Sequence, residues 1–399
     1  MTISLKNTMK IVLLDIKSNY SHLEWDGFFI YNIAIMAAKK KSALTKKQQK
    51  QIKKFAKKNP KVFIITVVVL ALLVGLGIGG YLLYKHFHKL ESGEVQIHFL
   101  ELGNSNIGDA TYIQVGDIDI LIDAGSRKNS AKTIEDYLKS KMSDKKLEYV
   151  IATHAHEDHI AGFVGTSDYG GIFDHYAVDN LIQFARTDNT SALYVDYSTK
   201  VESLKNNGTK VYTADQCVDN PFKIAENITL KILDQKYYHE KSSTENNYSV
   251  CALLTQGNNN YLFTGDLEKS GEESLVEKNP FLPHCQLFKG GHHGSITSSN
   301  ECLLEKIRPE VVCFCTCCGS EEYGSADLFP NQVVLDRIGI YTNKLYATGS
   351  IVDGEYKSLN GIITFICKKG SDYSIDCSND NKILKDTDWF KKNRVWNGV

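Results

Sequence analysis

The sequence predicts an α/β protein with sheets layered between helices, a site at one sheet edge, and one transmembrane helix in front. Three observations support this class: a charge difference along the chain, an uncharged apolar run, and an alternation of short strands with helices. Of the 399 residues, the first 90 carry 16 lysines and 3 acidic residues, a net charge of 16 − 3 = +13. The remainder carries 30 basic and 44 acidic side chains, a net charge of −14, so two physically different parts are joined.

The apolar run at 62–84 has 23 residues without a charge, enough for a helix across a hydrocarbon core of about 30 Å. Eleven lysines and no acid precede it at 39–61, which predicts a cytoplasmic N-terminus and an extracytoplasmic position for everything after residue 84. We expect a single-pass anchor in the cell membrane rather than a buried helix or a cleaved signal peptide, because the run is long and no A-x-A site follows. Gly75 and Gly79 would allow a homodimer through this helix; the alternative is glycine tolerated in lipid.

The start of the chain is less informative. The apolar run 27–36 is too short to span a membrane, and Met36 directly precedes the lysines, so residues 1–35 are either translated or upstream of the true start. The chain therefore divides into a lysine-rich cytoplasmic segment at 1–61, a transmembrane helix at 62–84, a main domain at 94–385 and a C-terminal tail at 386–399.

The main domain is rich in short apolar stretches between glycine and aspartate turns. Strands are expected at 95–102, 110–116, 118–125 and 147–154, and later in "NYSVCALLTQ", "NNNYLFTGD", "CQLFKGGHHGS" and "PEVVCFCT". Helices are expected at 130–142, 271–279 and 300–309. Several strands end on a polar residue, which predicts that these residues meet at one edge of the sheets.

The stretch 153–162, "THAHEDHIAG", places four potential metal ligands directly after a strand. In a tight turn, His154 and His156 would point to one side and share a metal, and Asp158 and His159 would point to another side and take a second. Zinc, manganese and iron accept imidazole and carboxylate ligands. Because four such groups are costly to bury unpaired, we expect one or two divalent ions, zinc or manganese, rather than a polar loop.

Other strand ends supply further candidates. Asp123 ends "ILIDAG", Asp266 ends "NYLFTGD", and His292 and His293 end "LFKGGHHGS". Each lies beside glycine, which lets the backbone approach a crowded centre. Singly, the two aspartates could be turn caps. Four strand ends that carry Asp or His favour a shared site.

Together these motifs resemble the metallo-β-lactamase fold. More narrowly, "ILIDAGS", "YVIATHAHEDHIAGF", "YLFTGDLEKSGEESL" and "LFKGGHHGSITSSNECLLEKIRPEVV" resemble the hydrolase domain of ComEC-type competence proteins, over residues 94–368. The resemblance implies an αββα sandwich with a metal site at the sheet edges.

The resemblance also implies a ligand set. One metal would be bound by His154 and His156, and the other by Asp158, His159 and a histidine of the GHHG turn. We prefer His292 over His293 for that place, because it lies nearer the strand end.

Asp123, Asp158 and Asp266 are the candidate catalytic residues. Metal-bound water has a pKa of about 7, so a metal-bound hydroxide would attack phosphorus or a carbonyl carbon, and the metals would stabilise the charge that develops. Asp266 would bridge the metals, Asp266 or Asp158 would relay the proton, and Asp123 would orient a ligand or the hydroxide. No general acid can be assigned.

Two stretches depart from the family pattern. A third histidine for the first metal often precedes the T-G-D strand, but here "STENNYSV" leaves Glu245 or Asn246, and an oxygen ligand would favour manganese over zinc. The competence-type pattern also usually has histidine directly before Pro330, where this chain has Phe329. We therefore expect this chain to lack a proton donor or a substrate contact at that position.

The resemblance implies phosphodiester substrates, DNA among them, whereas a charge of −14 repels polyphosphate unless a basic groove exists. "WFKKNRVW" at 389–396 could bind single strands, but a tail packed on the domain or on lipid is the stronger interpretation. Full competence proteins carry a multi-span channel, so DNA import by this chain alone is not expected. The leading hypothesis is a phosphodiesterase; the alternatives are hydrolysis of an ester, lactone or lactam, or a non-catalytic metal-containing binding module.

The chain has ten cysteines, among them an alternating set in "CFCTCC". Without paired CxxC spacing, Cys313, Cys315 and Cys317 are better interpreted as small buried hydrophobes than as a metal site. Whether the cysteines form disulfides stays open.

Overall fold

The structure is a computed structural model that describes residues 57–59, 93–142, 144–321, 328–368 and 372–399. The chain divides into two compact units, Met1–His88 and Lys89–Val399. Apart from 57–59, the predictions for the lysine-rich segment and the transmembrane helix lie outside the described residues. Within the described ranges, no helix is both long and apolar enough to cross a membrane.

The first sheet has eight strands in the order β16-β15-β1-β2-β3-β4-β5-β6. Pairing is antiparallel from β16 to β3 and parallel from β3 to β6. The strands are β1 (Val95–Phe99), β2 (Thr111–Val115), β3 (Ile118–Ile122), β4 (Lys146–Ala152), β5 (Ala177–Gln183), β6 (Lys210–Thr213), β15 (Ile363–Cys367) and β16 (Tyr373–Cys377). The helices that follow its strands are α5 (Ser130–Lys141), α6 (Glu157–Val164), α7 (Ile172–His175), α8 (Ala192–Asn206) and α9 (Ala214–Cys217).

The second sheet also has eight strands, in the order β14-β13-β12-β11-β10-β9-β8-β7, and its three inner pairs from β10 to β13 are parallel. The strands are β7 (Phe222–Ala225), β8 (Ile228–Leu233), β9 (Cys251–Gln256), β10 (Asn259–Phe263), β11 (Leu287–Lys289), β12 (Val311–Cys318), β13 (Leu345–Val352) and β14 (Glu355–Ser358). Its helices are α10 (Lys269–Lys278), α11 (Glu301–Ile307), α12 (Gln332–Gly339) and α13 (Asp388–Asn393). Short 3-10 turns are η1 (Lys236–Tyr238), η2 (Glu245–Tyr248), η3 (Gly291–Gly294) and η4 (Leu384–Asp386).

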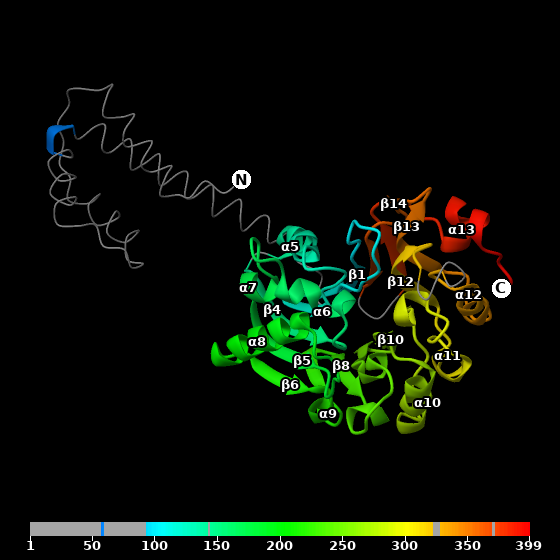
Figure 1. The fold of residues 1–399 in the computed structure, drawn as a ribbon, viewed down its shortest axis with the longest axis horizontal. Coiled ribbons are helices and arrows are strands. Elements are labelled where there is room, and N and C mark those ends of the chain that lie inside the picture. The colour runs from blue at the N-terminus through cyan, green and yellow to red at the C-terminus, as the bar shows by residue number, and fades with distance from the viewer. Residues whose placement is uncertain (1–56, 60–92, 143, 322–327, 369–371) are drawn as a thin grey trace. The chain divides into compact units, whose positions relative to one another are not determined.

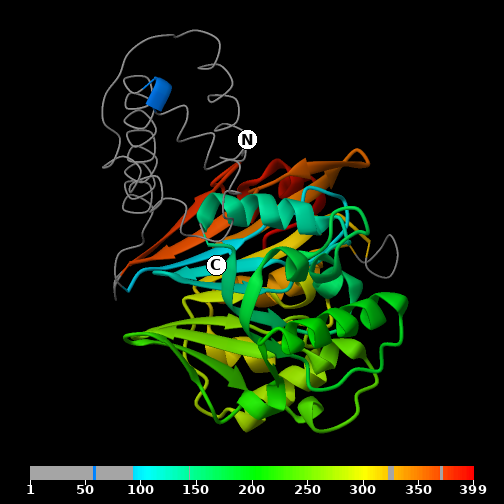
Figure 2. The same ribbon diagram turned by 90° about the vertical axis from the view of Figure 1, so that its left-hand side faces the viewer.

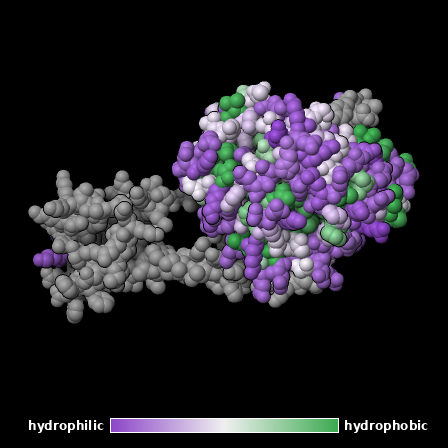
Figure 3. Space-filling model, turned by 90° about the horizontal axis from the view of Figure 1, so that it is seen from below, coloured by the Kyte–Doolittle hydropathy of each residue, from purple (hydrophilic) through white to green (hydrophobic). Residues whose placement is uncertain are grey.

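The elements form four layers. Helices α5–α8 gather on one side and α10–α13 on the other, with the strands between them (Figure 1), and the turned view shows α5–α8 in front of their sheet (Figure 2). One apolar core joins the two sheets and reaches α5–α8, and a second lies between the second sheet and α10–α13. The face seen from below is mainly hydrophilic, with apolar side chains scattered over it (Figure 3). The α/β class and the αββα layering are confirmed.

The helices and strands predicted from the hydrophobic pattern lie where the sequence places them. The helix expected at 130–142 is α5, which buries Ala131, Ile134 and Leu138 at helical spacing and carries lysines in its last turn. The strands expected at 95–102, 110–116, 118–125 and 147–154 are β1 to β4, and the helices expected at 271–279 and 300–309 are α10 and α11. Because β3 and β4 are parallel, as are β10 and β11, the residues after these strands can meet at one edge of the sandwich.

The interpretation of the cysteines as small hydrophobes is confirmed. Every residue of β12 is buried, and all ten cysteines are free thiols. Cys313 and Cys315 lie in the core between the sheets, whereas Phe314 and Cys318 lie in the core under the second helix layer, so the alternation follows the pleat of the strand.

The C-terminal segment is packed rather than free. Trp389 and Phe390 of α13 are buried in the second core, and the Val399 amide donates to the Gly339 carbonyl at 2.9 Å. The predicted tail, 386–399, therefore belongs to the same compact unit as the main domain. Its first tryptophan is not available to stack on a nucleic acid base.

Candidate metal centre

The histidine-rich turn is positioned by the turn that follows β3. His156 is the N-cap of α6, so the two residues after it in the motif lie in the first helical turn. The Ala124 amide donates to the His159 carbonyl at 2.8 Å. A Cβ at Gly125 would collide with the Asp158 carbonyl, so only glycine permits this approach. The D-A-G motif thus fixes the backbone that carries the H-x-H-x-D-H motif.

Asp123 orients one of the histidines. Its carboxylate accepts hydrogen bonds from the Thr153 amide at 2.8 Å and hydroxyl at 2.7 Å, and lies 2.8 Å from Nδ1 of His159. Because a carboxylate only accepts, Nδ1 of His159 carries a proton, and in the neutral ring Nε2 offers its lone pair. That Nε2 lies 3.0 Å from Oδ2 of Asp266. The contact between Asp123 and Nδ1 of His159 is the one that an orienting role for Asp123 requires.

His293 has the same arrangement on the second sheet. Its Nδ1 donates to the Cys315 carbonyl at 2.8 Å, which leaves Nε2 with a lone pair. Nε2 lies 3.2 Å from Oδ2 of Asp158 and 3.2 Å from Oδ2 of Asp266. The residue has a φ of 55°, in the left-handed region that non-glycine residues rarely adopt, and such strain is concentrated at functional sites.

His292 lies further out. Its Nε2 is 3.7 Å from Oδ2 of Asp266, and its Nδ1 contacts the Thr297 hydroxyl at 3.0 Å. Burial lowers the pKa of His292 to about 4, so this ring stays neutral. For His293, burial also lowers the pKa, but the carboxylates of Asp266 and Asp109 outweigh burial and raise it well above its usual value. The structure therefore places His293 closer to the shared carboxylates than His292, the residue that the sequence favoured.

Four residues meet at the sheet edges, and we call them the inner group: Asp158, His159, Asp266 and His293. Two imidazole Nε2 lone pairs face carboxylate oxygens at 3.0–3.2 Å, which is repulsive unless a cation or a proton lies among them. The pKa of His159, which burial would lower, is raised well above its usual value by Asp266 and Asp123. The donor set of two nitrogens and two carboxylates fits a divalent metal ion.

Sequence reasoning missed two residues that support this group. Asp109, just before β2, and Lys289, the last residue of β11, form a buried ion pair. Lys289 also lies 3.4 Å from Oδ1 of Asp266 and donates to the Gly265 carbonyl at 3.1 Å. Asp109 lies with His159, Asp266 and His293 in a cluster whose potential ligand atoms are within 4.8 Å of one another. The sequence carries two signals that could have identified them: Asp109 lies in a G-D-A motif just before a strand, and Lys289 is a lone lysine in an apolar strand.

The other two histidines of the motif form the histidine pair, His154 and His156. Nε2 of His154 lies 3.0 Å from Nδ1 of His156, so both nitrogens can share one ion. Burial, and then the neighbouring histidines His159 and His156, lower the pKa of His154 well below its usual value. The rings of His154 and His159 are 4.1 Å apart between centroids, so the pair adjoins the inner group.

The two oxygen candidates for the missing third histidine differ in position. Glu245 accepts from the Ala155 amide at 3.3 Å and lines the same hollow as His156. Asn246 instead donates to Oε1 of Glu268 at 2.8 Å. Of the two, Glu245 is the one beside the histidine pair.

Phe329 forms an apolar wall over the GHHG turn. It is 1% exposed, and its ring centroid lies 6.3 Å from that of His292 and 6.0 Å from that of His293. Arg394 from the C-terminal segment donates to the Leu328 carbonyl at 2.9 Å and to the Pro330 carbonyl at 3.0 Å. Arg394 thus fixes the backbone on both sides of Phe329, which occupies the position where the family pattern has a histidine.

Parts of the chain are similar to known proteins. The family model of the metallo-beta-lactamase superfamily matches residues 104–170. Over 110 residues, the chain is 34% identical to "Competence protein ComA" of Neisseria gonorrhoeae, which covers 27% of this chain and 15% of that protein. It is 31% identical over 104 residues to "Recombination protein 2" of Haemophilus influenzae and 26% identical over 123 residues to "ComE operon protein 3" of Bacillus subtilis. These matches span 12% and 15% of the two relatives.

Among solved structures, the chain is similar to the metallo-beta-lactamase fold protein YhfI of Bacillus subtilis. The sequence identity is 14%, the TM-score is 0.31, and the alignment covers 63% of this chain and 87% of that one.

Proposed function

We propose, because the chain carries a metallo-beta-lactamase domain and is homologous in part to ComA/ComEC-type competence proteins, that it is a metal-dependent hydrolase of phosphodiesters. The observation that carries the proposal is the inner group, in which two Nε2 lone pairs and two carboxylates converge. When bound there, a divalent ion would polarise the phosphoryl oxygen and lower the pKa of the attacking water.

Residues of the chain orient the metal-binding rings and supply the carboxylates. Asp123 holds the ring of His159 in one tautomer, and the Cys315 carbonyl does the same for His293. Asp266 contacts Nε2 of both rings, so with Asp158 it would supply the carboxylate ligands of the inner group. We propose that Asp266 would also serve a second ion and that the same two carboxylates would relay the proton.

The histidine pair would hold a second, weaker ion. His154 and His156 offer two nitrogens there, and Glu245 is already an acceptor for two backbone amides, those of Ala155 and Asp188. A ligand set completed by oxygen favours manganese over zinc.

We further propose that residues 62–84 anchor the chain in the lipid bilayer, with residues 1–61 in the cytoplasm and the hydrolase domain outside. The uncharged run and the eleven lysines before it support this orientation. Gly75 and Gly79 support a homodimer through the same segment.

A second candidate, a metal-containing binding module without catalysis, is favoured by one observation. The buried Phe329 covers the GHHG turn where a proton donor is usual. Such a module would keep the metal and lack turnover.

The test uses the full chain in detergent, stripped of metal by a chelator and reloaded with Mn²⁺ or Zn²⁺. Hydrolysis of bis(p-nitrophenyl) phosphate is compared with that of p-nitrophenyl acetate, for the wild type, Asp158→Ala and His159→Ala. His284→Ala is the control, because His284 is a half-exposed histidine that pairs with Glu310 before β11, away from the sheet edge.

We expect metal-dependent cleavage of the phosphodiester that both inner-group substitutions abolish and the control retains. Cleavage of the acetate alone would replace the phosphodiesterase by an esterase. Bound metal without any turnover would favour the binding module.

A further inference from the structure

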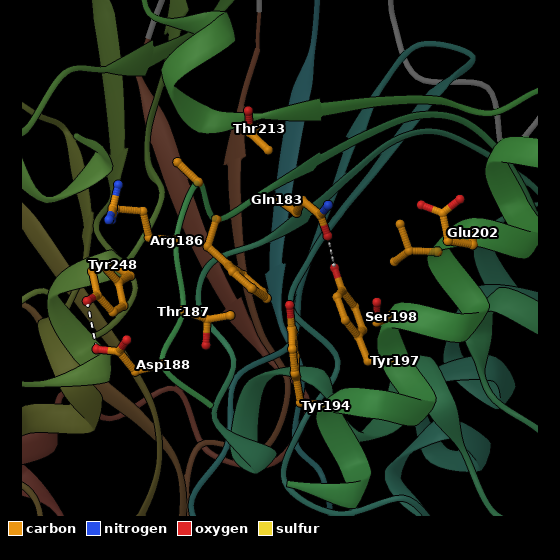
Figure 4. Close-up of a pocket in the computed structure, with 13 residues that line it drawn as sticks. Gln183, Arg186, Thr187, Asp188, Tyr194, Tyr197, Ser198, Glu202, Thr213 and Tyr248 are labelled. Carbon is orange, nitrogen blue, oxygen red and sulfur yellow. Dashed lines mark hydrogen bonds between the residues drawn. The ribbon is translucent and has the colours of Figure 1, made fainter. Parts of the chain in front are cut away.

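A cleft leads away from the histidine pair. One hollow of about 360 Å³ is lined by His156, Glu245, Asp188 and neighbouring polar residues. A second hollow, of about 430 Å³, is lined by residues of β5, the loop after it and α8 (Figure 4). Asp188 lines both, so they form one surface, which we call the β5–α8 cleft. Each hollow is within the range of about 300–1,000 Å³ typical of small-molecule sites.

Of the three carboxylates that line the cleft, Asp188 and Glu245 have close partners, and Glu202 lies 3.9 Å from Lys205. The Tyr248 hydroxyl donates to Asp188 at 3.1 Å, as Figure 4 shows, and Lys241 pairs with Asp188 at 3.5 Å. Glu245 accepts from the Ala155 and Asp188 amides. These acids are therefore used to shape the two loops and do not require a cationic ligand.

Arg186 differs from them. It is the one arginine or lysine among the residues that line the two hollows. Its Nη1 donates to the His239 carbonyl at 3.4 Å, a long hydrogen bond, and none of the ion pairs among the described residues includes it. An exposed guanidinium with no carboxylate partner in the cleft is suited to a phosphate.

Aromatic side chains form the wall next to Arg186. Phe184 and Tyr197 are buried and nearly parallel, with ring centroids 5.9 Å apart, and the Tyr197 hydroxyl donates to Gln183 at 3.1 Å. Tyr194 lies nearly parallel to Tyr197 at 6.4 Å, is only partly buried, and presents its hydroxyl end to the middle of the cleft (Figure 4). A ring can thus rest against Tyr194, supported from behind by two fixed aromatic rings.

We propose that the β5–α8 cleft binds the end of a short phosphodiester: one nucleoside-sized ring against Tyr194, and one phosphate beyond the scissile bond paired with Arg186. This deepens the proposed function and rests on it. A long strand would need several cations along its path, and this cleft offers one in a domain whose net charge is strongly negative. The single cation therefore selects a short substrate or a strand end.

The experiment compares two thymidine dinucleotides that differ only in a 5′-phosphate, using the full, metal-loaded chain. The 5′-phosphate should lower KM about tenfold, which is the effect of one charge-assisted hydrogen bond on binding. Arg186→Gln should abolish that difference, whereas Arg308→Gln, an exposed arginine at the end of α11, should leave it intact. Tyr194→Ala should raise KM for both dinucleotides, and Tyr194→Phe, which keeps the ring, should not.

Binding of the same dinucleotides by calorimetry separates this inference from the proposed function. If nothing is hydrolysed but the 5′-phosphate still tightens binding through Arg186, the phosphodiesterase fails and the cleft assignment stands. If the 5′-phosphate gives no advantage in either measurement, the assignment is overturned. Affinity that rises steadily up to a 20-residue single strand, with steep salt dependence that Arg186→Gln leaves unchanged, would also overturn it.

Discussion

The histidine-rich turn contributes two ligand candidates to each half of the candidate centre, yet the two halves are built differently. In the inner group, both histidines have their Nδ1 atoms fixed by protein acceptors and their Nε2 atoms aimed at shared carboxylates. In the histidine pair, the two rings face each other, His156 is only partly buried, and Glu245, which lines the same hollow, already accepts from the Ala155 amide. Preorganised ligands lose less freedom on binding, so the halves should bind metal unequally.

The largest effect should come from substitution of Lys289, the buried cation beside the inner group, and should appear in the free energy of unfolding. Lys289→Met removes the buried ammonium group that pairs with Asp109 and lies 3.4 Å from Asp266. Breaking a buried ion pair costs about 3–5 kcal/mol, so the free energy of unfolding of the metal-free protein should fall by that order. Denaturant unfolding measures it. A change below about 1 kcal/mol would mean that Lys289 does not balance these carboxylates.

The next effect separates the adjacent histidines. His293→Ala should reduce metal affinity and hydrolysis by more than about 100-fold, because a direct ligand matters more than the outer contacts that cost 10–100-fold. His292→Ala should cost much less, since its Nε2 lies further from Asp266. Metal titration of both variants decides the matter. Equal losses would contradict the assignment of His293 as the inner ligand.

The histidine pair should respond more mildly. His156→Ala should remove one metal equivalent and lower hydrolysis about tenfold, because it leaves every contact of the inner group in place. Metal content by elemental analysis checks the stoichiometry. Loss of both ions together would show that the halves are one cooperative site.

The smallest effect should come from the C-terminal segment. Arg394→Gln removes hydrogen bonds to the carbonyls on both sides of Phe329, and hydrogen bonds contribute about 1 kcal/mol each. We expect about a fivefold loss of metal affinity in the inner group as Phe329 shifts from His293. Lys392→Gln, an exposed change on the same helix, is the control. Equal behaviour of the two variants would separate Phe329 from the centre.

The comparison also shows what sequence can predict. The H-x-H-x-D-H turn, Asp123 and Asp266 were predictable, because each lies within a few residues of a strand end and strand ends meet by topology. The choice between His292 and His293 was not, because both have left-handed backbone and only the Cys315 carbonyl decides which ring turns inward. Asp109 and Lys289 escaped for a related reason: each looks like a turn or strand residue until the two sheets bring them together.

The most direct test of the unequal halves is the metal content of the full chain after dialysis against a graded series of chelator concentrations. For the wild type, the account predicts two steps: one ion is lost at low chelator concentration, and the second is retained until much higher concentrations. His156→Ala should show only the second step. His293→Ala should lose its metal at low chelator concentration. A single step that removes all metal, or retention of the tight ion by His293→Ala, would contradict it.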